Sequence, residues 1–233
     1  MKTSDSNPVF RTAGDTGLIA EFGEGIDPVI NARVRAVARG FASQMPQGVK
    51  EIIPTYRSLL FIYDPCMVSP DILMDLTRKM KDTEPDDITA GRMVEIPVCY
   101  GGEYGPDMDN VRSSSGLAEQ EVIQIHSRPE YLIYMVGFTP GFCFLGGLDE
   151  RLFTPRLKTP RMAVPQGSVG IANNQTGMYP IESPGGWQII GRTPLRLFAP
   201  ERENPFLYRA GDSIRFIPVS DAEYHRIKQE EQG

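Results

Sequence analysis

Apolar positions in roughly the first ninety residues form two kinds of pattern: the helical spacing of three and four residues, and short continuous runs typical of strands. Residues 30–45 carry apolar side chains at spacings of three and four, which predicts an amphipathic helix, and Asp27 followed by Pro28 is a typical helix start. Ser69 and Pro70 repeat this start ahead of a second apolar stripe. Apolar runs predict three strands, at Leu18–Phe22, Val49–Ile53 and Ser58–Tyr63. We therefore expect a small α+β domain, with one sheet and its helices on one face.

The pattern changes after the polar segment 81–90, which we interpret as a linker. Glycine and proline then recur every few residues between short apolar runs, as is typical of a closed β-barrel or a sandwich. A helix capped by Asp107 and a second helix over Leu117–His126 are expected, and the polar tail 221–233 is expected to fray. The expected strands are Arg92–Tyr100, Tyr131–Val136, Ser168–Ile171, Trp187–Ile190, Leu195–Phe198 and Ser213–Pro218. The chain thus divides into a first domain, 1–88, and a second, 89–233.

Composition narrows the functional classes. The net charge is −6, which argues against a nucleic-acid partner because phosphate binding needs a basic surface. The N-terminus has no apolar core of the length that a signal peptide requires. Cys66, Cys99 and Cys143 are odd in number and lack CxxC spacing, which favours three buried thiols in a reducing compartment. We therefore expect a cytoplasmic protein.

Several kinds of site and segment are not supported by the sequence. Segment 131–148 is uncharged and long enough to suggest a membrane helix, but glycine and proline interrupt it, so we expect a buried strand that runs into a tight apolar loop. With two histidines and no cluster at ligand spacing, no metal site is expected. Phosphate-loop, dinucleotide-binding and nucleophile-elbow motifs are absent. Ser113–Gly116 faintly resembles an amidase serine loop, but a connection between two helices explains it better.

The stretch between Leu152 and Ile181 contains no Asp or Glu, although the chain is acidic overall. Two Thr-Pro-Arg units within it end at Arg156 and Arg161, and each proline restricts the backbone beside its arginine. Guanidinium groups without competing carboxylates suit bidentate recognition of phosphate or carboxylate. Alternatively, the basic residues of this stretch pair across the surface with acidic ones, and composition favours neither interpretation. The candidate acidic partners are Asp149, Glu150 and Glu182.

His126 is expected at the C-terminus of a helix, where the helix dipole would favour a protonated imidazole. A lone histidine is more often structural than catalytic, but the loops 137–142 and 183–187 follow it and are rich in glycine, which allows close approach to a ligand. We take His126 as the candidate catalytic residue. The candidate binding residues are Tyr131, Phe138, Pro140, Gly141, Phe142, Arg156, Arg161, Gln166, Gln175, Tyr179, Gly185 and Trp187.

An ordered series of short motifs points to a family. The series includes Ile96-Pro97-Val98, Gly137-Phe138-x-Pro140-Gly141-Phe142, Gly167-Ser168-Val169-Gly170-Ile171, Gln175-Thr176-Gly177-x-Tyr179-Pro180, Ser183-Pro184-Gly185-Gly186-Trp187 and Gly211-Asp212-Ser213. In these motifs the chain resembles, over nearly its whole length, the family of the 5-oxoprolinase B subunit. This family is also called allophanate hydrolase subunit 1 and includes the Kip-type kinase inhibitor. One departure is Ala118, which removes a capping box with Glu121.

The resemblance implies a cyclophilin-like β-barrel after the small α+β domain, and two partners, the C subunit with a related barrel and the A subunit. It implies that the complex couples ATP hydrolysis, with Mg²⁺ at or near the partner interface, to the opening of 5-oxo-L-proline to L-glutamate, and that this chain is inactive alone. Two other functions stay open: a carboxyltransferase-like subunit of urea or allophanate metabolism, and a non-catalytic inhibitor of a sporulation histidine kinase. Loss of activity with retained assembly in His126→Ala and Arg156→Ala would favour the enzyme.

Overall fold

The computed structural model describes residues 7–80 and 91–232, and the chain separates into two compact units, Met1–Gly91 and Arg92–Gly233. The predicted linker 81–90 and the predicted boundary after residue 88 lie outside the described residues. Each unit is therefore described by itself.

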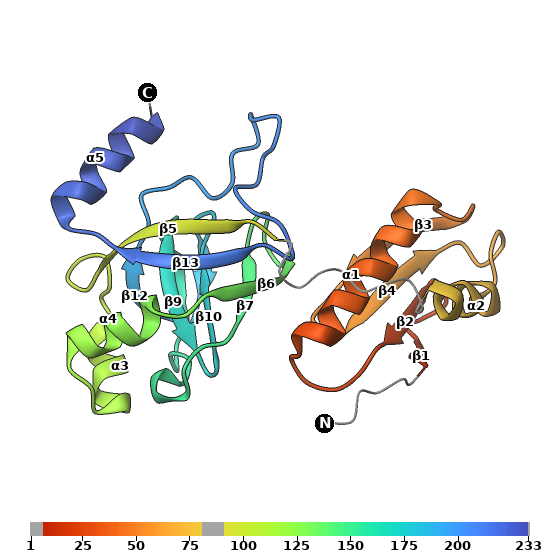
Figure 1. The fold of residues 1–233 in the computed structure, drawn as a ribbon, viewed down its shortest axis with the longest axis horizontal. Helices are drawn as coiled ribbons and strands as arrows, with labels where there is room; N and C mark the ends of the chain where they lie inside the picture. Colours follow the sequence, from red (N-terminus) through yellow and green to blue (C-terminus); the bar gives the residue numbers. More distant parts are fainter. Residues whose placement is uncertain (1–6, 81–90, 233) are drawn as a thin grey trace. The chain divides into compact units, whose positions relative to one another are not determined.

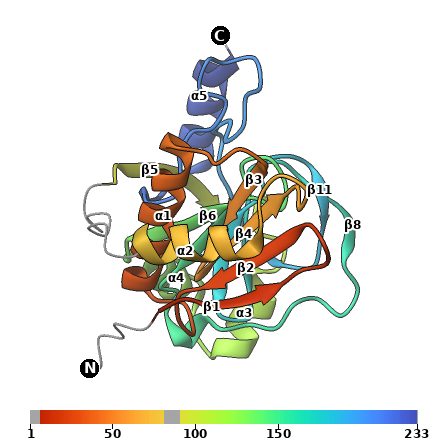
Figure 2. The same ribbon diagram turned by 90° about the vertical axis from the view of Figure 1, so that its right-hand side faces the viewer.

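The N-terminal unit is an antiparallel sheet with two helices against it (Figures 1 and 2). Its strands are β1 (Val9–Thr12), β2 (Gly17–Glu21), β3 (Val49–Pro54) and β4 (Ser58–Tyr63), in the order β1-β2-β4-β3. Helix α1 (Pro28–Ser43) contacts β3 and β4, helix α2 (Pro70–Met80) contacts β2, and the two helices contact each other. Both helices thus cover one face of the sheet, which confirms the predicted α+β class; β1 was not predicted.

Local chemistry sets the start and the buried face of α1. The Asp27 carboxylate accepts hydrogen bonds from the backbone N–H groups of Val29 (2.8 Å) and Ile30 (3.0 Å), so it satisfies two donors of the first turn. Phe41, from the same helix, packs edge-on against Phe61 of β4 with ring centroids 4.9 Å apart. Both rings are fully buried, and this contact joins helix to sheet in the core of the unit.

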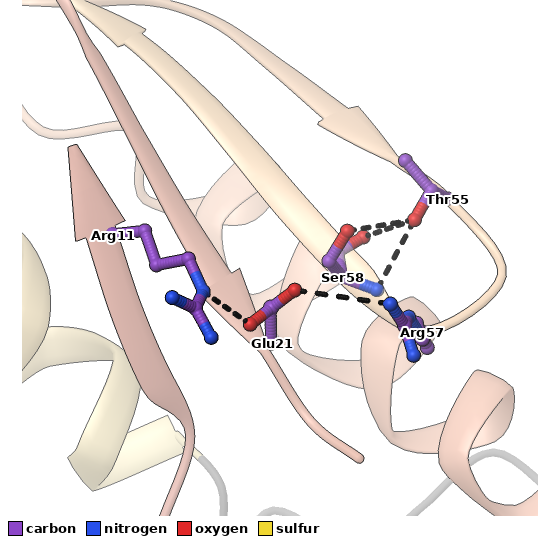
Figure 3. Close-up of polar contacts among 5 residues, drawn as sticks. All are labelled: Arg11, Glu21, Thr55, Arg57 and Ser58. Atoms are coloured by element: carbon purple, nitrogen blue, oxygen red, sulfur yellow. Dashed lines mark hydrogen bonds and ion pairs between the residues drawn. The ribbon is translucent and has the colours of Figure 1, made fainter. Parts of the chain in front are cut away.

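Polar contacts order the rim of this sheet (Figure 3). Glu21 of β2 accepts a 2.8 Å hydrogen bond from Arg11 of β1 and lies 4.0 Å from Arg57 in the β3–β4 turn. Within that turn, the Ser58 backbone N–H donates to the Thr55 hydroxyl at 3.1 Å, and the Thr55 N–H donates to the Ser58 carbonyl at 2.8 Å. Exposed ion pairs contribute little to stability, so the turn bonds do more to hold the β3–β4 connection.

The C-terminal unit is built on a seven-stranded sheet that curls into a nearly closed barrel (Figure 1). Its strands are β5 (Met93–Tyr100), β6 (Tyr131–Val136), β7 (Cys143–Gly146), β9 (Ser168–Ala172), β10 (Gln175–Met178), β12 (Gln188–Arg192) and β13 (Ser213–Pro218). Their order is β10-β9-β12-β5-β13-β6-β7; β5 and β13 are parallel, and the other paired strands are antiparallel. The terminal strands β7 and β10 contact each other, which confirms the predicted barrel class. A separate pair, β8 (Arg161–Val164) and β11 (Ser183–Gly185), lies outside this sheet.

Helices complete the barrel unit. α3 (Met108–Ser115) packs against β12, and α4 (Glu119–Ser127) packs against β13. Ala118 provides no capping side chain, but the Glu121 carboxylate still accepts from the Ala118 backbone N–H at 2.8 Å, so half of the capping box remains. A short 3-10 helix, η1 (Glu150–Leu152), follows β7, and α5 (Asp221–Gln232) ends the described chain. The predicted fraying of the tail is wrong for Asp221–Gln232, which form this helix.

Three other predictions are corrected. Leu195–Phe198 form no strand; Phe198 makes a single bridge to Phe206, where Pro205 has no N–H to continue a ladder. In segment 131–148 the expected strand, β6, does run into a loop, but a second strand, β7, follows and pairs with it as a β-hairpin. Cys66 is exposed, whereas Cys99 and Cys143 are buried as expected.

Candidate functional site

Three aromatic rings pack together beside the separate strand pair β8 and β11. We call this cluster of Phe142, Tyr179 and Trp187 the aromatic floor. Phe142 precedes β7, Tyr179 follows β10 and Trp187 precedes β12. Their centroids lie 5.6 Å apart for Phe142 and Trp187, 5.9 Å for Phe142 and Tyr179, and 6.4 Å for Tyr179 and Trp187, with each pair edge to face. All three side chains are buried. The structure therefore brings together three candidates that are separated by up to 45 residues in the sequence.

The Tyr179 hydroxyl lies against the backbone of Gly185, the last residue of β11. A Cβ atom at Gly185 would lie 2.2 Å from this hydroxyl oxygen, so this close approach requires glycine at position 185. Burial raises the pKa of the Tyr179 phenol, and a hydrogen bond from the Trp187 backbone and the charges of Arg156 and Arg161 partly oppose this shift. Tyr179 thus stays protonated at neutral pH while it lies in the field of two guanidinium groups.

Arg161, at the start of β8, is fixed by a buried carboxylate. Its Nη2 donates to Asp107 Oδ1 at 2.6 Å, and the other carboxylate oxygen accepts from the Ile189 backbone N–H at 2.7 Å. Asp107 was predicted to cap a helix, but its side chain makes no cap bond to α3 because it is turned towards β12 and Arg161. The arginines were expected either to be free for an anion or to pair with Asp149, Glu150 or Glu182. Neither interpretation holds for all of them, since Arg161 pairs with Asp107 and Arg151 pairs with Asp149.

Arg156 has a fixed backbone and an unpaired charge. The Pro155 carbonyl accepts from Gln188 Nε2 at 2.8 Å, and the Leu157 N–H donates to the Gly186 carbonyl at 2.7 Å, so the backbone is held on both sides of Arg156. Arg156 and Lys158 are exposed, and within residues 7–80 and 91–232 no carboxylate forms an ion pair with either. The Arg156 guanidinium is therefore available to an anion at the edge of the aromatic floor.

The remaining loop candidates lie elsewhere. Phe138, Pro140 and Gly141 line a pocket of about 430 Å³, together with Phe206 and residues 208–210. Phe138 is 80% exposed and has a positive φ of 72°, which is uncommon for a residue with a bulky side chain. Gln166 lines another pocket, of about 460 Å³, and half-buried Gln175 starts β10. The structure thus does not gather all of the predicted binding residues into one site.

His126 is a fully buried residue of α4 with both ring nitrogens engaged. Nδ1 lies 2.8 Å from the Tyr100 hydroxyl, and Nε2 lies 2.8 Å from Thr176 Oγ1. The Thr176 hydroxyl donates to the Gly170 carbonyl at 3.0 Å, so its oxygen is left to accept the proton of Nε2. Tyr100 then donates to Nδ1, and the chain of bonds is satisfied with a neutral imidazole.

Burial lowers the pKa of His126 to about 3, so the expectation of a protonated ring is wrong: loss of hydration outweighs the helix dipole. The ring also stacks on Phe216 at 4.6 Å, and the buried Tyr131 hydroxyl donates to the His126 carbonyl at 2.7 Å. These are contacts of core residues. A catalytic role for His126 and a binding role for Tyr131 stay predictions.

Sequence reasoning missed the polar residues that support Arg156 and Arg161. Besides Asp107, Gln188 connects Pro155 to Asn110, whose side-chain amide donates to Gln188 Oε1 at 3.0 Å. Asp107 and Gln188 were predicted from the sequence only as parts of secondary structure. The available signal for Gln188 was a polar residue between Trp187 and Ile189 in an expected strand, since a buried polar side chain needs a partner.

Among the residues that the structure describes, no group of three or more His, Cys, Asp and Glu side chains is arranged to hold a metal ion. No helix in this part of the chain combines the length and the apolar character needed to cross a bilayer.

Comparisons with known proteins identify the family. Residues 8–208 match the model of the carboxyltransferase domain, subdomain C and D. The chain is 44% identical to the 5-oxoprolinase B subunit of Bacillus subtilis over 93% of this chain and 95% of that protein, and 40% identical to the 5-oxoprolinase B subunit of Escherichia coli O157:H7 over 89% and 94%. Urea amidolyase of Lachancea kluyveri is 25% identical, and the match covers 98% of this chain but 14% of that protein.

A solved structure agrees with these sequence relationships. The structure of TTHA0988 superposes on this chain with a TM-score of 0.79 and 39% sequence identity. The match covers 88% of this chain and 40% of that longer chain. The extent and the identity of these matches lead to one conclusion. The chain belongs to the family of the 5-oxoprolinase B subunit, whose members carry subdomains C and D of the carboxyltransferase domain.

Proposed function

We propose that this chain is the B subunit of an ATP-dependent 5-oxoprolinase, which opens 5-oxo-L-proline to L-glutamate as it hydrolyses ATP in the cytoplasm. The A and C subunits would complete the enzyme, and this chain would be inactive alone. The match to named B subunits supports the proposal. The observation that carries it is the unpaired Arg156, whose backbone is held on both sides and whose charge acts on Tyr179, in a stretch without acidic residues.

The chemistry of the reaction fits these groups. A lactam is a poor electrophile, and phosphorylation of its carbonyl oxygen turns that oxygen into a leaving group. The substrate carries a carboxylate and the phosphorylated lactam carries a second anion, so the reaction needs fixed cationic groups. Arg156 supplies one, and the protonated Tyr179 supplies a neutral donor. ATP, with Mg²⁺, is a substrate of the complex and would be bound at or near the partner interface.

The test is reconstitution of the enzyme with its A and C subunits. We expect ATP hydrolysis that depends on 5-oxoproline, with equimolar glutamate, when all three subunits are present, and none with this chain alone. Omission of each subunit in turn is the control. Urea and allophanate should be tested beside 5-oxoproline, because the family also includes urea amidolyase segments. Turnover of urea or allophanate without turnover of 5-oxoproline would contradict the proposal.

Arg156→Gln should lower kcat/KM for 5-oxoproline in the complete enzyme by about 100-fold, since loss of one charge-assisted contact in a site costs a few kcal/mol. The control is Arg226→Gln on α5, where the arginine pairs with Glu223 and Glu230. Steady-state kinetics of both variants, with assembly checked by gel filtration, measure the effect. Equal kcat/KM in Arg156→Gln and the parent enzyme would remove Arg156 from the site.

A further inference from the structure

A polar pocket of about 460 Å³ lies where helix α5 meets the end of β12. Residues 192–196 form one wall, and Tyr224, Lys228 and Glu231 of α5 form another. Gln166 completes the lining. This pocket shares no lining residue with the Arg156 site.

Two cations of this pocket lie against a pair of packed aromatic rings. Lys228 Nζ lies 5.8 Å from the centroid of the buried Tyr224 ring, and the Arg192 guanidinium lies 5.9 Å from the centroid of the Tyr104 ring, which packs against Tyr224. The Arg192 Nε is buried and has no hydrogen-bond partner. No carboxylate among the described residues forms an ion pair with Arg192 or Lys228. The pocket therefore holds two positive charges and a spare buried donor.

The other charged groups of the lining are already engaged. Arg196 pairs with Glu201 at 2.6 Å. Glu231 accepts from the Arg196 backbone N–H at 3.4 Å and from Arg202 Nη2 at 3.4 Å. These contacts leave Arg192 and Lys228 as the cations without an acidic partner, and a buried unsatisfied donor is costly unless a ligand or water accepts from it.

We propose that this pocket binds the phosphate group of a small molecule. A phosphate dianion balances the charges of Arg192 and Lys228 together, whereas a single carboxylate balances one of them. Its several oxygens also provide acceptors for the neutral Gln166 amide and the Thr193 hydroxyl, which lie in the same lining. The two cations come from β12 and from α5, so the site exists because the C-terminal segment folds as a helix beside the barrel.

The experiment uses the isolated full chain and inorganic pyrophosphate as the probe. Isothermal titration should detect binding, and amide shifts in NMR spectra should localise it to residues 192–196 and 224–231. Arg192→Gln and Lys228→Gln should each weaken binding by at least about tenfold, since each removes one charge-assisted contact. The matched control is again Arg226→Gln, on α5 but outside the lining, which should leave the affinity unchanged.

Further probes decide the chemistry of the ligand. Glutarate, a dicarboxylate, should bind at least tenfold more weakly than pyrophosphate; equal binding would overturn the phosphate assignment. Tighter binding of ATP than of pyrophosphate would identify a nucleotide as the source of the phosphate, and equal binding would identify a simple phosphate ester. Lys228 is exposed on its helix, so Lys228→Gln stays informative even if Arg192→Gln fails to fold. Absence of pyrophosphate binding, or unchanged binding in Lys228→Gln, would overturn the proposal. Since the assay needs no other protein, its outcome is separate from that of the proposed enzymatic activity.

Discussion

Asp107→Ala is expected to destabilise the barrel unit by about 3 kcal/mol, because it breaks a largely buried ion pair and leaves a buried backbone donor without a partner. The Asp107 side chain is 5% exposed and binds both Arg161 and the Ile189 N–H. Its removal would leave the Asp107 N–H bond to the Ile189 carbonyl as the link at this point between the start of α3 and β12, and would free Arg161, which is 32% exposed and can regain part of its hydration. That partial hydration places the expected loss at the lower end of the range for broken buried pairs.

Fluorescence of Trp187, the one tryptophan of the chain, reports the barrel unit during urea or thermal unfolding. The expected loss corresponds to a Tm about 10 °C lower for a unit of this size. Asp107→Asn should recover part of the loss, since the amide oxygen can still accept from the Ile189 N–H. Asp109→Ala is the matched control, because Asp109 is 87% exposed and its single pair with Arg112 lies on the surface. Equal stability of Asp107→Ala and Asp109→Ala would show that the buried carboxylate does not hold this corner of the fold.

The N-terminal unit was predictable in most of its elements because its signals are local. Asp27 and Pro28 act within one turn of helix, and the period of three and four over residues 30–45 is set by the one buried face of α1. Strand β1 was missed because it is an exposed edge strand with a single half-buried side chain, at Phe10, and so shows no apolar run.

Helix α5 was not predictable from apolar periodicity, because Tyr224 is the only buried side chain among residues 221–231. Its exposed face is instead stabilised by charge pairs three and four residues apart, between Arg226 and the side chains of Glu223 and Glu230. The charge pattern was present in the sequence. A polar tail was nevertheless expected to fray, since composition alone does not show that Tyr224 packs against Tyr104 of a distant segment.

The location of the candidate site was more predictable than the roles of its residues. Absence of acidic residues is visible in one segment of sequence, and it correctly marked Arg156 as a cation without a local competitor. The partner of Arg161 is a residue 54 positions earlier, so only the barrel topology brings Asp107 to it. For the same reason, the sequence could not show that Gln166 lines a pocket beside α5 that includes none of the three rings of the aromatic floor.

The barrel unit is expected to lose about 2.5 kcal/mol of stability between pH 7 and pH 4.5 through His126 alone. The folded protein keeps this imidazole neutral, since its pKa is lowered to about 3, whereas the unfolded chain protonates it near the ordinary value of 6.5. Below pH 6.5 the unfolded state therefore binds one more proton, and stability falls as the pH falls towards 3. The loss approaches about 1.4 kcal/mol for each pH unit in this window.

His126→Gln isolates this contribution, because glutamine does not titrate and can still bond to Tyr100 and Thr176. The variant should be less stable at pH 7, through loss of the stacking contact with Phe216, but its stability should change less with pH. Urea unfolding followed by Trp187 fluorescence at pH 7, 6, 5.5 and 4.5 measures both. Carboxylates that titrate in this range are shared by the two proteins, so their contribution cancels in the difference. His225→Gln is the matched control, since His225 is exposed on α5 and its removal leaves the buried bonds of His126 in place. Parallel pH dependence in His126→Gln and the parent protein would show that the buried ring takes up its proton without unfolding of the barrel.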